Sequence, residues 1–236
     1  MNLPFNKQRS NGFTIIELML AMGFISLLLL AIALLTLHLG TIYNQGITLR
    51  EVNEAGLTVS EDIQRTIGAA APFVINASKE SNRYITSTEG GRLCVGSHTY
   101  AWNYLGNTPS GEMNKYTTPQ SAPISLVKVA DPGGRLCRAE NVYERINPDN
   151  ANELLAVGDR NLVVYDFKIS SPTSVSITAG QTLYAVDFTI GTNGTDIVDA
   201  TNKTCRPPSE SSRSREYCAV NQFSIIVRAG SEAGGR

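Results

Sequence analysis

A long apolar segment near the amino terminus most constrains how this chain of 236 residues can fold. Leu18–Leu35 contains no charged residue and a single polar residue, Ser26, and its apolar character continues to Ile42. As a helix, the stretch from Phe13 to Ile42 would be about 45 Å long. That length is sufficient to cross the hydrocarbon core of a bilayer, which is about 30 Å thick. The sequence therefore predicts a membrane-spanning helix.

The residues before this segment predict its orientation. Lys7 and Arg9 precede it, and no acidic residue occurs before Glu17. The positive-inside rule then keeps the amino terminus in the cytoplasm and exports the residues after the span. Two other interpretations fit less well. A cleaved secretory signal would have a shorter apolar core and a small-residue cleavage site, and a buried helix of a soluble protein is rarely so long and so apolar.

Glu17 lies inside the apolar stretch, where a lone carboxylate costs on the order of 3 kcal/mol or more. The residues around it read Ser10-Asn11-Gly12-Phe13-Thr14-Ile15-Ile16-Glu17-Leu18. Here the chain resembles the type IV pilin superfamily, which has a short basic leader, a glycine, a phenylalanine, an apolar run and a glutamate at these relative positions. The alternative is a chance glutamate in an ordinary single-pass anchor.

The resemblance implies how the chain is processed. The prepilin peptidase of that family cuts after the glycine and methylates the new terminal residue, so the cut would fall between Gly12 and Phe13, and Phe13 would be N-methylated. Lys7 and Arg9 would be leader charges, and Glu17 would be the fifth residue of the mature chain. The new α-amino group of one subunit and Glu17 of its neighbour are each costly to bury alone and much less costly together, so the pair would fix axial register during assembly.

The helix is expected to continue beyond the membrane with one apolar face. No proline occurs between Pro4 and Pro72, and Gly68 is followed by three alanines and Pro72, which predicts the helix end. We expect a single helix from Phe13 to about Gly68. Apolar or small residues recur at helical spacing in its second half: Leu49, Val52, Gly56, Val59, Ile63 and Ile67.

After Pro72 the apolar period changes to two, which predicts β-strands. The expected strands are Leu93–Leu105, Ile124–Val129, Arg135–Ala139, Leu162–Ile169, Leu183–Ile190 and Phe223–Arg228, with a hairpin turn at Asp131-Pro132-Gly133-Gly134. Most of them should pair antiparallel and pack one face on the helix. The predicted fold class is α+β, divided into a leader (1–12), the membrane-spanning or filament-core half of the helix (13–42), its amphipathic half (43–71) and an exported β-rich head (72–236).

Four cysteines, Cys94, Cys137, Cys205 and Cys218, all fall on the exported side, where disulfides persist. Three connectivities are possible. Local closure favours Cys205–Cys218, and the repeated sequence Gly-Gly-Arg-Leu-Cys at 90–94 and 133–137 favours Cys94–Cys137. The spacings lack the close pairs of a zinc site. A disulfide loop near the carboxyl terminus is also similar to that of many pilins.

Four aromatic or imidazole residues, His98, Tyr100, Trp102 and Tyr104, would share one strand face. Such a face can stack on single-stranded nucleic acid or a glycan. No basic run accompanies it, so we favour the structural interpretation, in which the aromatic face packs on a helix or loop.

Two further groups also have a functional and a structural interpretation. Arg213 and Arg215 would suit a DNA-binding loop, but two neighbouring glutamates neutralise them. Asn193, Asp196 and Asp199 would suit a calcium site, but they lack the EF-hand spacing, and an Asx-rich turn is favoured.

No catalytic motif is visible: the sequence has no nucleophile elbow, phosphate loop or nucleophilic cysteine context. We therefore expect no enzymatic activity and no cofactor or metal. A net charge of −1 gives no general attraction to nucleic acid, so a nucleic-acid partner is not expected, although a DNA-binding tip pilin stays among the alternatives.

The resemblance implies a minor pilin, a structural subunit that primes or caps a type IV pilus, because the head of about 165 residues is larger than a compact major pilin needs. Its strands look similar to those of PilW/PulJ-type minor pilins. The alternatives are a minor pseudopilin of a type II secretion system, a tip pilin whose head binds DNA or a surface ligand, and a plain single-pass membrane protein.

The implied partners are other major and minor pilins through the helix, prepilin peptidase, the inner-membrane assembly machinery, and the lipid bilayer before assembly. The implied location is the inner membrane, with the amino terminus inside and the head periplasmic. After assembly the subunit would lie in a pilus at the cell surface.

Overall fold

The computed structural model describes residues 14–75, 83–104, 116–117, 124–138, 146–155, 161–171, 181–194, 196–199, 201–207 and 217–230. It divides into a first unit, residues 1–43, and a second unit, residues 44–236. The fold class is α+β, as the sequence predicts, with one long helix, antiparallel sheets and two disulfides.

Helix α1 runs from Ile15 to Ala69 without a break, in agreement with the predicted helix. Its first part, in the first unit, is long and apolar enough to cross a membrane. At its end, the Ala70 amide donates to the Ile67 carbonyl, and the Ala70 carbonyl accepts a hydrogen bond from Gly230. The alanine run and Pro72 that follow Gly68 therefore terminate the helix where the sequence indicates.

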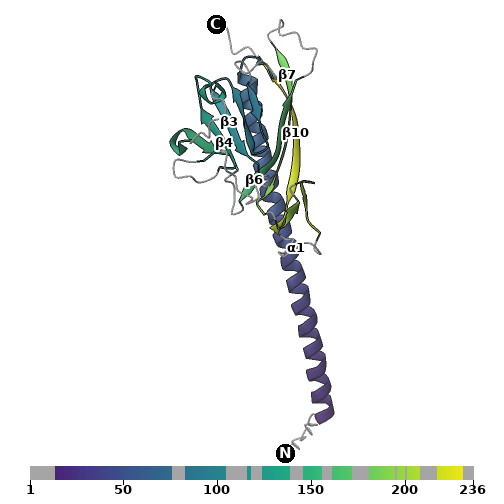
Figure 1. Cartoon of the computed structure of the whole chain (residues 1–236). Helices are drawn as coiled ribbons and strands as arrows, with labels where there is room; N and C mark the ends of the chain where they lie inside the picture. Colours follow the sequence, from purple (N-terminus) through teal and green to yellow (C-terminus); the bar gives the residue numbers. More distant parts are fainter. Residues whose placement is uncertain are drawn as a thin grey trace, which may run out of the picture. The chain divides into compact units, whose positions relative to one another are not determined.

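The second unit contains two larger sheets in which all strand pairs are antiparallel (Figure 1). The five-stranded sheet has the order β1 (Tyr84–Thr86), β2 (Gly90–Val95), β3 (His98–Asn103), β4 (Leu126–Ala130) and β5 (Ala151–Glu153). The three-stranded sheet has the order β10 (Val220–Ala229), β7 (Thr182–Thr192) and β6 (Leu162–Ser170). A small hairpin, β8 (Val198–Asp199) and β9 (Thr204–Cys205), and two short helices, α2 (Arg135–Arg138) and η1 (Pro148–Asn150), complete the described elements.

The stretch predicted as one strand over Leu93–Leu105 is a hairpin of two strands, β2 and β3. Gly96 and Ser97 form its turn, and Gly96 has a φ of 58°, a conformation that favours glycine. Gly-Ser between two apolar runs is itself a signal for a two-residue hairpin, so the sequence contained this information. The strands predicted within Ile124–Val129, Leu162–Ile169, Leu183–Ile190 and Phe223–Arg228 are confirmed as β4, β6, β7 and β10.

The predicted strand Arg135–Ala139 is wrong, because Arg135–Arg138 forms the helical turn α2. The carboxylate of Asp131 accepts the backbone N–H groups of Arg135 and Leu136 at 2.8 and 3.0 Å, which caps this turn. Thr99, on β3, donates to the same carboxylate at 3.0 Å and fixes its position. The repeated Gly-Gly-Arg-Leu-Cys sequence therefore adopts two different structures, a strand at 90–94 and a turn with a helix at 133–137.

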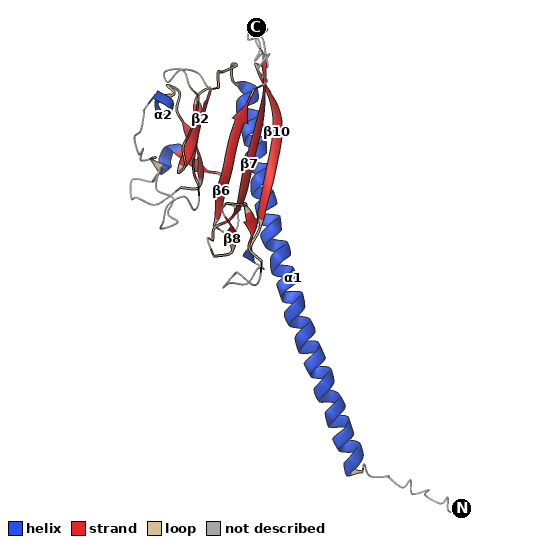
Figure 2. Ribbon diagram, turned by 45° about the vertical axis from the view of Figure 1, so that its right-hand side comes forward, coloured by secondary structure: helices blue, strands red, loops and turns tan. Residues whose placement is uncertain are grey.

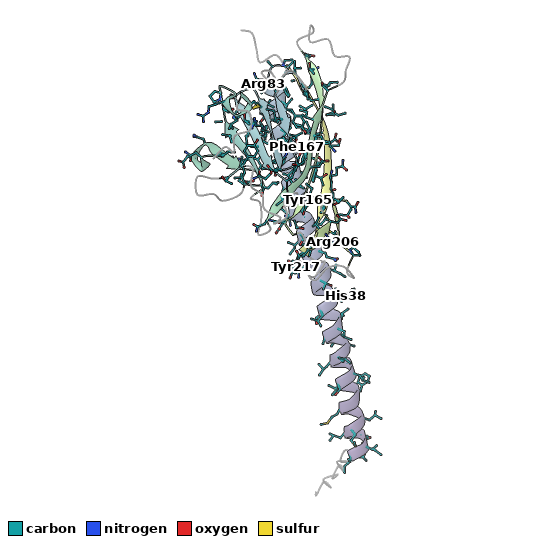
Figure 3. The ribbon with its side chains drawn as sticks, viewed as in Figure 1. His38, Arg83, Tyr165, Phe167, Arg206 and Tyr217 are labelled. Carbon is teal, nitrogen blue, oxygen red and sulfur yellow. A yellow bond between two sulfur atoms is a disulfide. The ribbon has the colours of Figure 1, made fainter. Side chains whose placement is uncertain are left out.

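The core of the second unit lies on one face of α1, between the two sheets (Figure 2). Five helix residues, Val52, Ala55, Val59, Ile63 and Ile67, are completely buried there. The two sheets meet directly where Trp102 of β3 stacks on Phe167 of β6 at 4.3 Å between ring centroids, and Figure 3 shows Phe167 among the packed side chains. Leu49, predicted to belong to this face, is instead 49% exposed.

Gly56 allows β10 to approach the helix. A Cβ atom at this position would lie 2.0 Å from Cζ of Phe223, whose ring stacks on Phe188 at 5.2 Å. At Gly46, another glycine of the same helix, a Cβ atom would meet no heavy atom within 4 Å apart from the adjoining backbone of the helix itself. Gly56 therefore faces a packed aromatic ring, whereas Gly46 faces open space, although both lie in the same helix.

We expect Gly56→Ala to lower the free energy of unfolding by about 1–3 kcal/mol, because the Phe223 ring must leave its position. Gly46→Ala should leave it unchanged or raise it by about 0.5–1 kcal/mol, since alanine favours the helix. The measurement is urea unfolding of the full chain in detergent, followed by the fluorescence of Trp102, the single tryptophan. Equal effects of the two changes would show that Gly56 does not provide this contact.

Candidate functional site

The apolar half of α1 presents its side chains to its surroundings on all sides of the helix. Within Ile15–Tyr43 the exposed fractions of the large apolar side chains range from 45% at Leu28 to 80% at Ile15. Figure 3 shows these side chains projecting around the whole helix, with His38 near the end of this half. An apolar surface of this extent requires lipid or another protein to cover it.

The serine and threonine hydroxyls in this half are satisfied within the helix. Ser26 donates to the Met22 carbonyl at 2.8 Å and Thr36 donates to the Ala33 carbonyl at 2.8 Å. Thr41 donates in the same way to the carbonyl of His38 at 2.7 Å. Polar groups bonded to the backbone of their own helix are tolerated in hydrocarbon, because no donor is left without an acceptor.

Glu17 forms a capping box with Thr14 at the start of α1. The backbone N–H and the hydroxyl of Thr14 donate to Oε2 of Glu17 at 3.0 and 2.9 Å, and the Glu17 N–H lies 3.3 Å from Oγ1 of Thr14. The pattern Thr-x-x-Glu is a known signal for a helix start, so this cap could have been predicted from the sequence. Glu17 therefore has a partner within its own chain, besides any partner supplied by a neighbour.

The other residues of the predicted processing site lie outside the described residues. These are the leader charges Lys7 and Arg9 and the cleavage residues Gly12 and Phe13. Thr14 and Glu17, by contrast, lie after the predicted cut. Removal of residues 1–12 would therefore leave the helix cap intact.

Both predicted disulfides are confirmed. Cys94–Cys137 joins β2 to α2, and Cys205–Cys218 joins β9 to the segment before β10. Cys94 and Cys137 are buried, with exposed fractions of 2% and 6%. Cys205 and Cys218 are only partly buried.

The centre of the aromatic face of β3 packs inside the second unit, whereas His98 and Tyr104 at its two ends are partly buried. Tyr100 and Trp102 are completely buried. The Tyr100 hydroxyl donates to Oδ2 of Asp62 at 2.6 Å and lies 2.7 Å from Oγ1 of Thr66. Burial is the main cause that raises the pKa of Tyr100, and the hydrogen bond to Asp62 raises this pKa further. Lys128 of β4 donates to Asp62 and Thr66 at 2.9 and 2.8 Å, so these four residues tie α1 to the five-stranded sheet.

Asp199, one of the three residues of the candidate calcium site, holds the turn between β8 and β9. Oδ1 of Asp199 accepts the N–H groups of Thr201 and Asn202 at 2.9 and 3.2 Å, and its Oδ2 accepts the Asn202 side-chain amide at 2.7 Å. These hydrogen bonds hold the pKa of Asp199 below its usual value and form the expected Asx turn. Within the described ranges, no three His, Cys, Asp or Glu side chains gather as they would around a metal ion. Arg213 and Arg215 lie outside those ranges.

A small hollow of about 280 Å³ lies beside β4 and α2 and is lined in part by Val129, Asp131, Arg135 and Ile146. Its carboxylate is already bonded to Thr99 and to the α2 backbone. Of the charged residues that line the hollow, Arg135 is therefore the one whose side chain is not used in these bonds. The described lining residues do not combine a nucleophile with a base.

Compared with known proteins, the chain matches no protein-family model, no curated protein and no solved structure. A functional proposal therefore rests on the chemistry of the amino-terminal segment itself.

We expect no alkylated cysteine when the full chain is denatured and alkylated without reductant, and four alkylated cysteines after reduction. Under native conditions a mild thiol should open Cys205–Cys218 before Cys94–Cys137, because attack requires access to a sulfur atom. Intact mass and peptide mapping measure both results. Four free thiols without reductant, or earlier opening of Cys94–Cys137, would contradict the structure.

Proposed function

We propose that this chain is a minor pilin, a structural subunit that primes or caps a type IV pilus. The observation that supports it is the order of Gly12-Phe13, then Glu17, at the start of an exposed apolar helix. The chain would be made as a prepilin, cut after Gly12 and N-methylated on Phe13. Its helix would then leave the bilayer by exchanging lipid for the helices of other pilins.

The helix start supports a specific role for Glu17. After the cut, the ammonium group of Phe13 would lie one residue before the cap residue Thr14, at the positive end of the helix dipole, where a cation is disfavoured. A carboxylate from a neighbouring subunit would offset that charge. The bonds from Thr14 use Oε2 of Glu17; among the described residues no donor reaches Oε1, which can accept from a neighbour's ammonium group.

The proposed location follows from the same segment. The basic leader keeps the amino terminus in the cytoplasm, and the two disulfides fit a head in an oxidising, extracytoplasmic compartment. Prepilin peptidase and the inner-membrane assembly machinery would act on the membrane form. Other pilins would contact the assembled form.

Three variants separate the charge of Glu17 from its role as a cap. Glu17→Gln keeps an oxygen that can accept from Thr14 but removes the charge, and Glu17→Ala removes both. Thr14→Ala removes the cap hydroxyl and keeps the charge. We expect both Glu17 variants to insert and to be cleaved, but to enter sheared pili at about one tenth of the wild-type level or less, because the buried ammonium group loses its partner. Thr14→Ala should stay close to wild type.

The measurement is the ratio of the protein in sheared pili to that in membranes, by immunoblot. If Glu17→Gln assembles like wild type while Glu17→Ala and Thr14→Ala both fail, Glu17 acts only as a helix cap. If all three variants assemble like wild type, Glu17 has no role in assembly. Either result contradicts the proposal.

A further inference from the structure

The hollow of about 280 Å³ in the second unit lies where the end of β4, the helical turn α2 and the residues of η1 come together. The pairing of Val129 of β4 with Ala151 of β5 brings η1, which directly precedes β5, beside the end of β4. Figure 2 shows α2 on the side of the five-stranded sheet that faces away from α1. Pockets for drug-sized ligands begin at about 300 Å³, so this hollow suits a molecule with a single ring.

The floor of the hollow is aliphatic. Val129, Leu136 and Ile146 line it, and all three are buried. They belong to one packed apolar cluster of the second unit. The described lining residues include no aromatic ring. A ligand would therefore cover this floor with C–H groups of its skeleton, which removes apolar surface from water.

The charges of the lining select the charge of the ligand. Oδ1 of Asp131 accepts the Arg135 N–H at 2.8 Å, and Oδ2 accepts the Thr99 hydroxyl and the Leu136 N–H, both at 3.0 Å. This carboxylate is therefore occupied by the fold and is not left for an ammonium group of a ligand. The guanidinium group of Arg135, in contrast, bonds to none of the described residues.

A single guanidinium group matches a single carboxylate, because its parallel N–H groups bind the two oxygens together. A doubly charged phosphate would bring a second negative charge next to Asp131, and the described lining holds no second cation to offset it. The hollow therefore favours a monoanion, and a carboxylate in particular.

Two exposed asparagine side chains add uncharged polar groups to the lining. Oδ1 of Asn147 accepts the Asp149 N–H at 3.1 Å, which leaves its amide nitrogen as a donor. The side chain of Asn150 bonds to no described residue and can both donate and accept. Hydroxyl groups, which also donate and accept, are the ligand groups that pair with both amides.

We propose that this hollow binds a small hydroxylated monocarboxylate with the chemistry of a single acidic sugar. Its carboxylate would pair with Arg135, its hydroxyls with Asn147 and Asn150, and its C–H face would lie on Val129 and Ile146. An amino acid is disfavoured because its ammonium group would lack an acceptor, and an aliphatic acid because it would leave the amides unpaired. The inference uses only residues of the second unit and does not rest on the pilin proposal.

The first test measures ligand binding by the full chain in detergent, with detergent alone as the blank, by saturation-transfer NMR titrations. The probe is D-glucuronate. D-glucose keeps the ring and removes the charge, isobutyrate keeps the carboxylate and removes the hydroxyls, and inorganic phosphate is a different anion. We expect glucuronate to bind with a dissociation constant of about 0.1–10 mM, as its small size allows, and the other three to bind about tenfold more weakly or less.

The second test compares two arginine variants. Arg135→Gln should weaken glucuronate binding by about tenfold or more, because the charge-assisted bonds are lost. Arg83→Gln is the matched control: Nη1 of Arg83 would lie 2.8 Å from a Cβ atom at Gly134, beside α2, but Arg83 does not line the hollow, and Figure 3 labels it. This control should bind within about twofold of wild type. Both variants should unfold at the wild-type urea concentration, because neither guanidinium group makes a described bond of the fold.

A third variant tests the selection of hydroxyl groups. Asn150→Ala should weaken glucuronate binding by about three- to tenfold and leave isobutyrate binding unchanged, because only the sugar acid loses a hydrogen bond. Methyl β-D-glucuronide then distinguishes two sources of the ligand. Binding equal to that of glucuronate assigns the site to an acidic residue of a glycan, and loss of binding assigns it to the free acid.

Four results would overturn the proposal: no binding of glucuronate up to about 50 mM, well above the expected range; equal binding of glucose; equal binding of phosphate, which would show a general anion site; or equal effects of Arg135→Gln and Arg83→Gln. Equal losses of glucuronate and isobutyrate binding in Asn150→Ala would contradict the assignment of the hydroxyls.

Discussion

One face of α1, from Val52 to Ile67, is the surface on which the second unit depends, because both sheets bury their apolar faces on it. Burying each large aliphatic side chain of this face contributes about 1.5–3 kcal/mol. The hydrogen bonds from Tyr100 and Lys128 to Asp62 and Thr66 fix the rotation of the helix about its axis. A different rotation would leave these polar groups without partners, which is costly where they are buried. Gly56 then sets how closely β10 approaches.

The same helix has a different surface in each unit, and this difference connects the fold to the proposed function. From Ile15 to Tyr43 the helix presents apolar side chains on every side, and its serine and threonine hydroxyls bond to its own backbone. Beyond Asn44 only one side is buried. A helix of the first type suits exchange between lipid and other helices, whereas one of the second type requires a folded partner, which the sheets supply.

The sequence predicted the features that depend on long periodic patterns or on local closure. Helix α1, strands β6, β7 and β10 and both disulfides belong to this group. One error, the single strand predicted over Leu93–Leu105, arose because a local Gly-Ser turn signal was not used. The other errors arose where the pattern of the local sequence does not decide the structure. Arg135–Arg138 is helical because Asp131, held by Thr99 of another strand, caps it, and Leu49 is exposed although it continues the apolar pattern of the helix.

The functional features of the chain also differ in whether a local sequence pattern indicates them. The Thr14–Glu17 cap was readable as Thr-x-x-Glu but was not used, whereas the hollow beside β4 and α2 is not visible in any local pattern. That hollow follows from the pairing of β4 with β5, which brings Asn150 beside the end of β4, and from the cap that Asp131 supplies to α2. Local sequence patterns therefore contain the signal for the helix cap but not the arrangement of the surface of the head.

The central functional claim is that the chain is processed as a prepilin, and the amino terminus of the protein from cell envelopes tests it most directly. Mass spectrometry of the terminal peptide should find a chain that begins at Phe13 and carries one methyl group on its α-amino nitrogen. In cells that lack prepilin peptidase, the terminal peptide should retain residues 1–12. A mature chain that begins at any other residue, or the same terminus with and without the peptidase, would contradict the account.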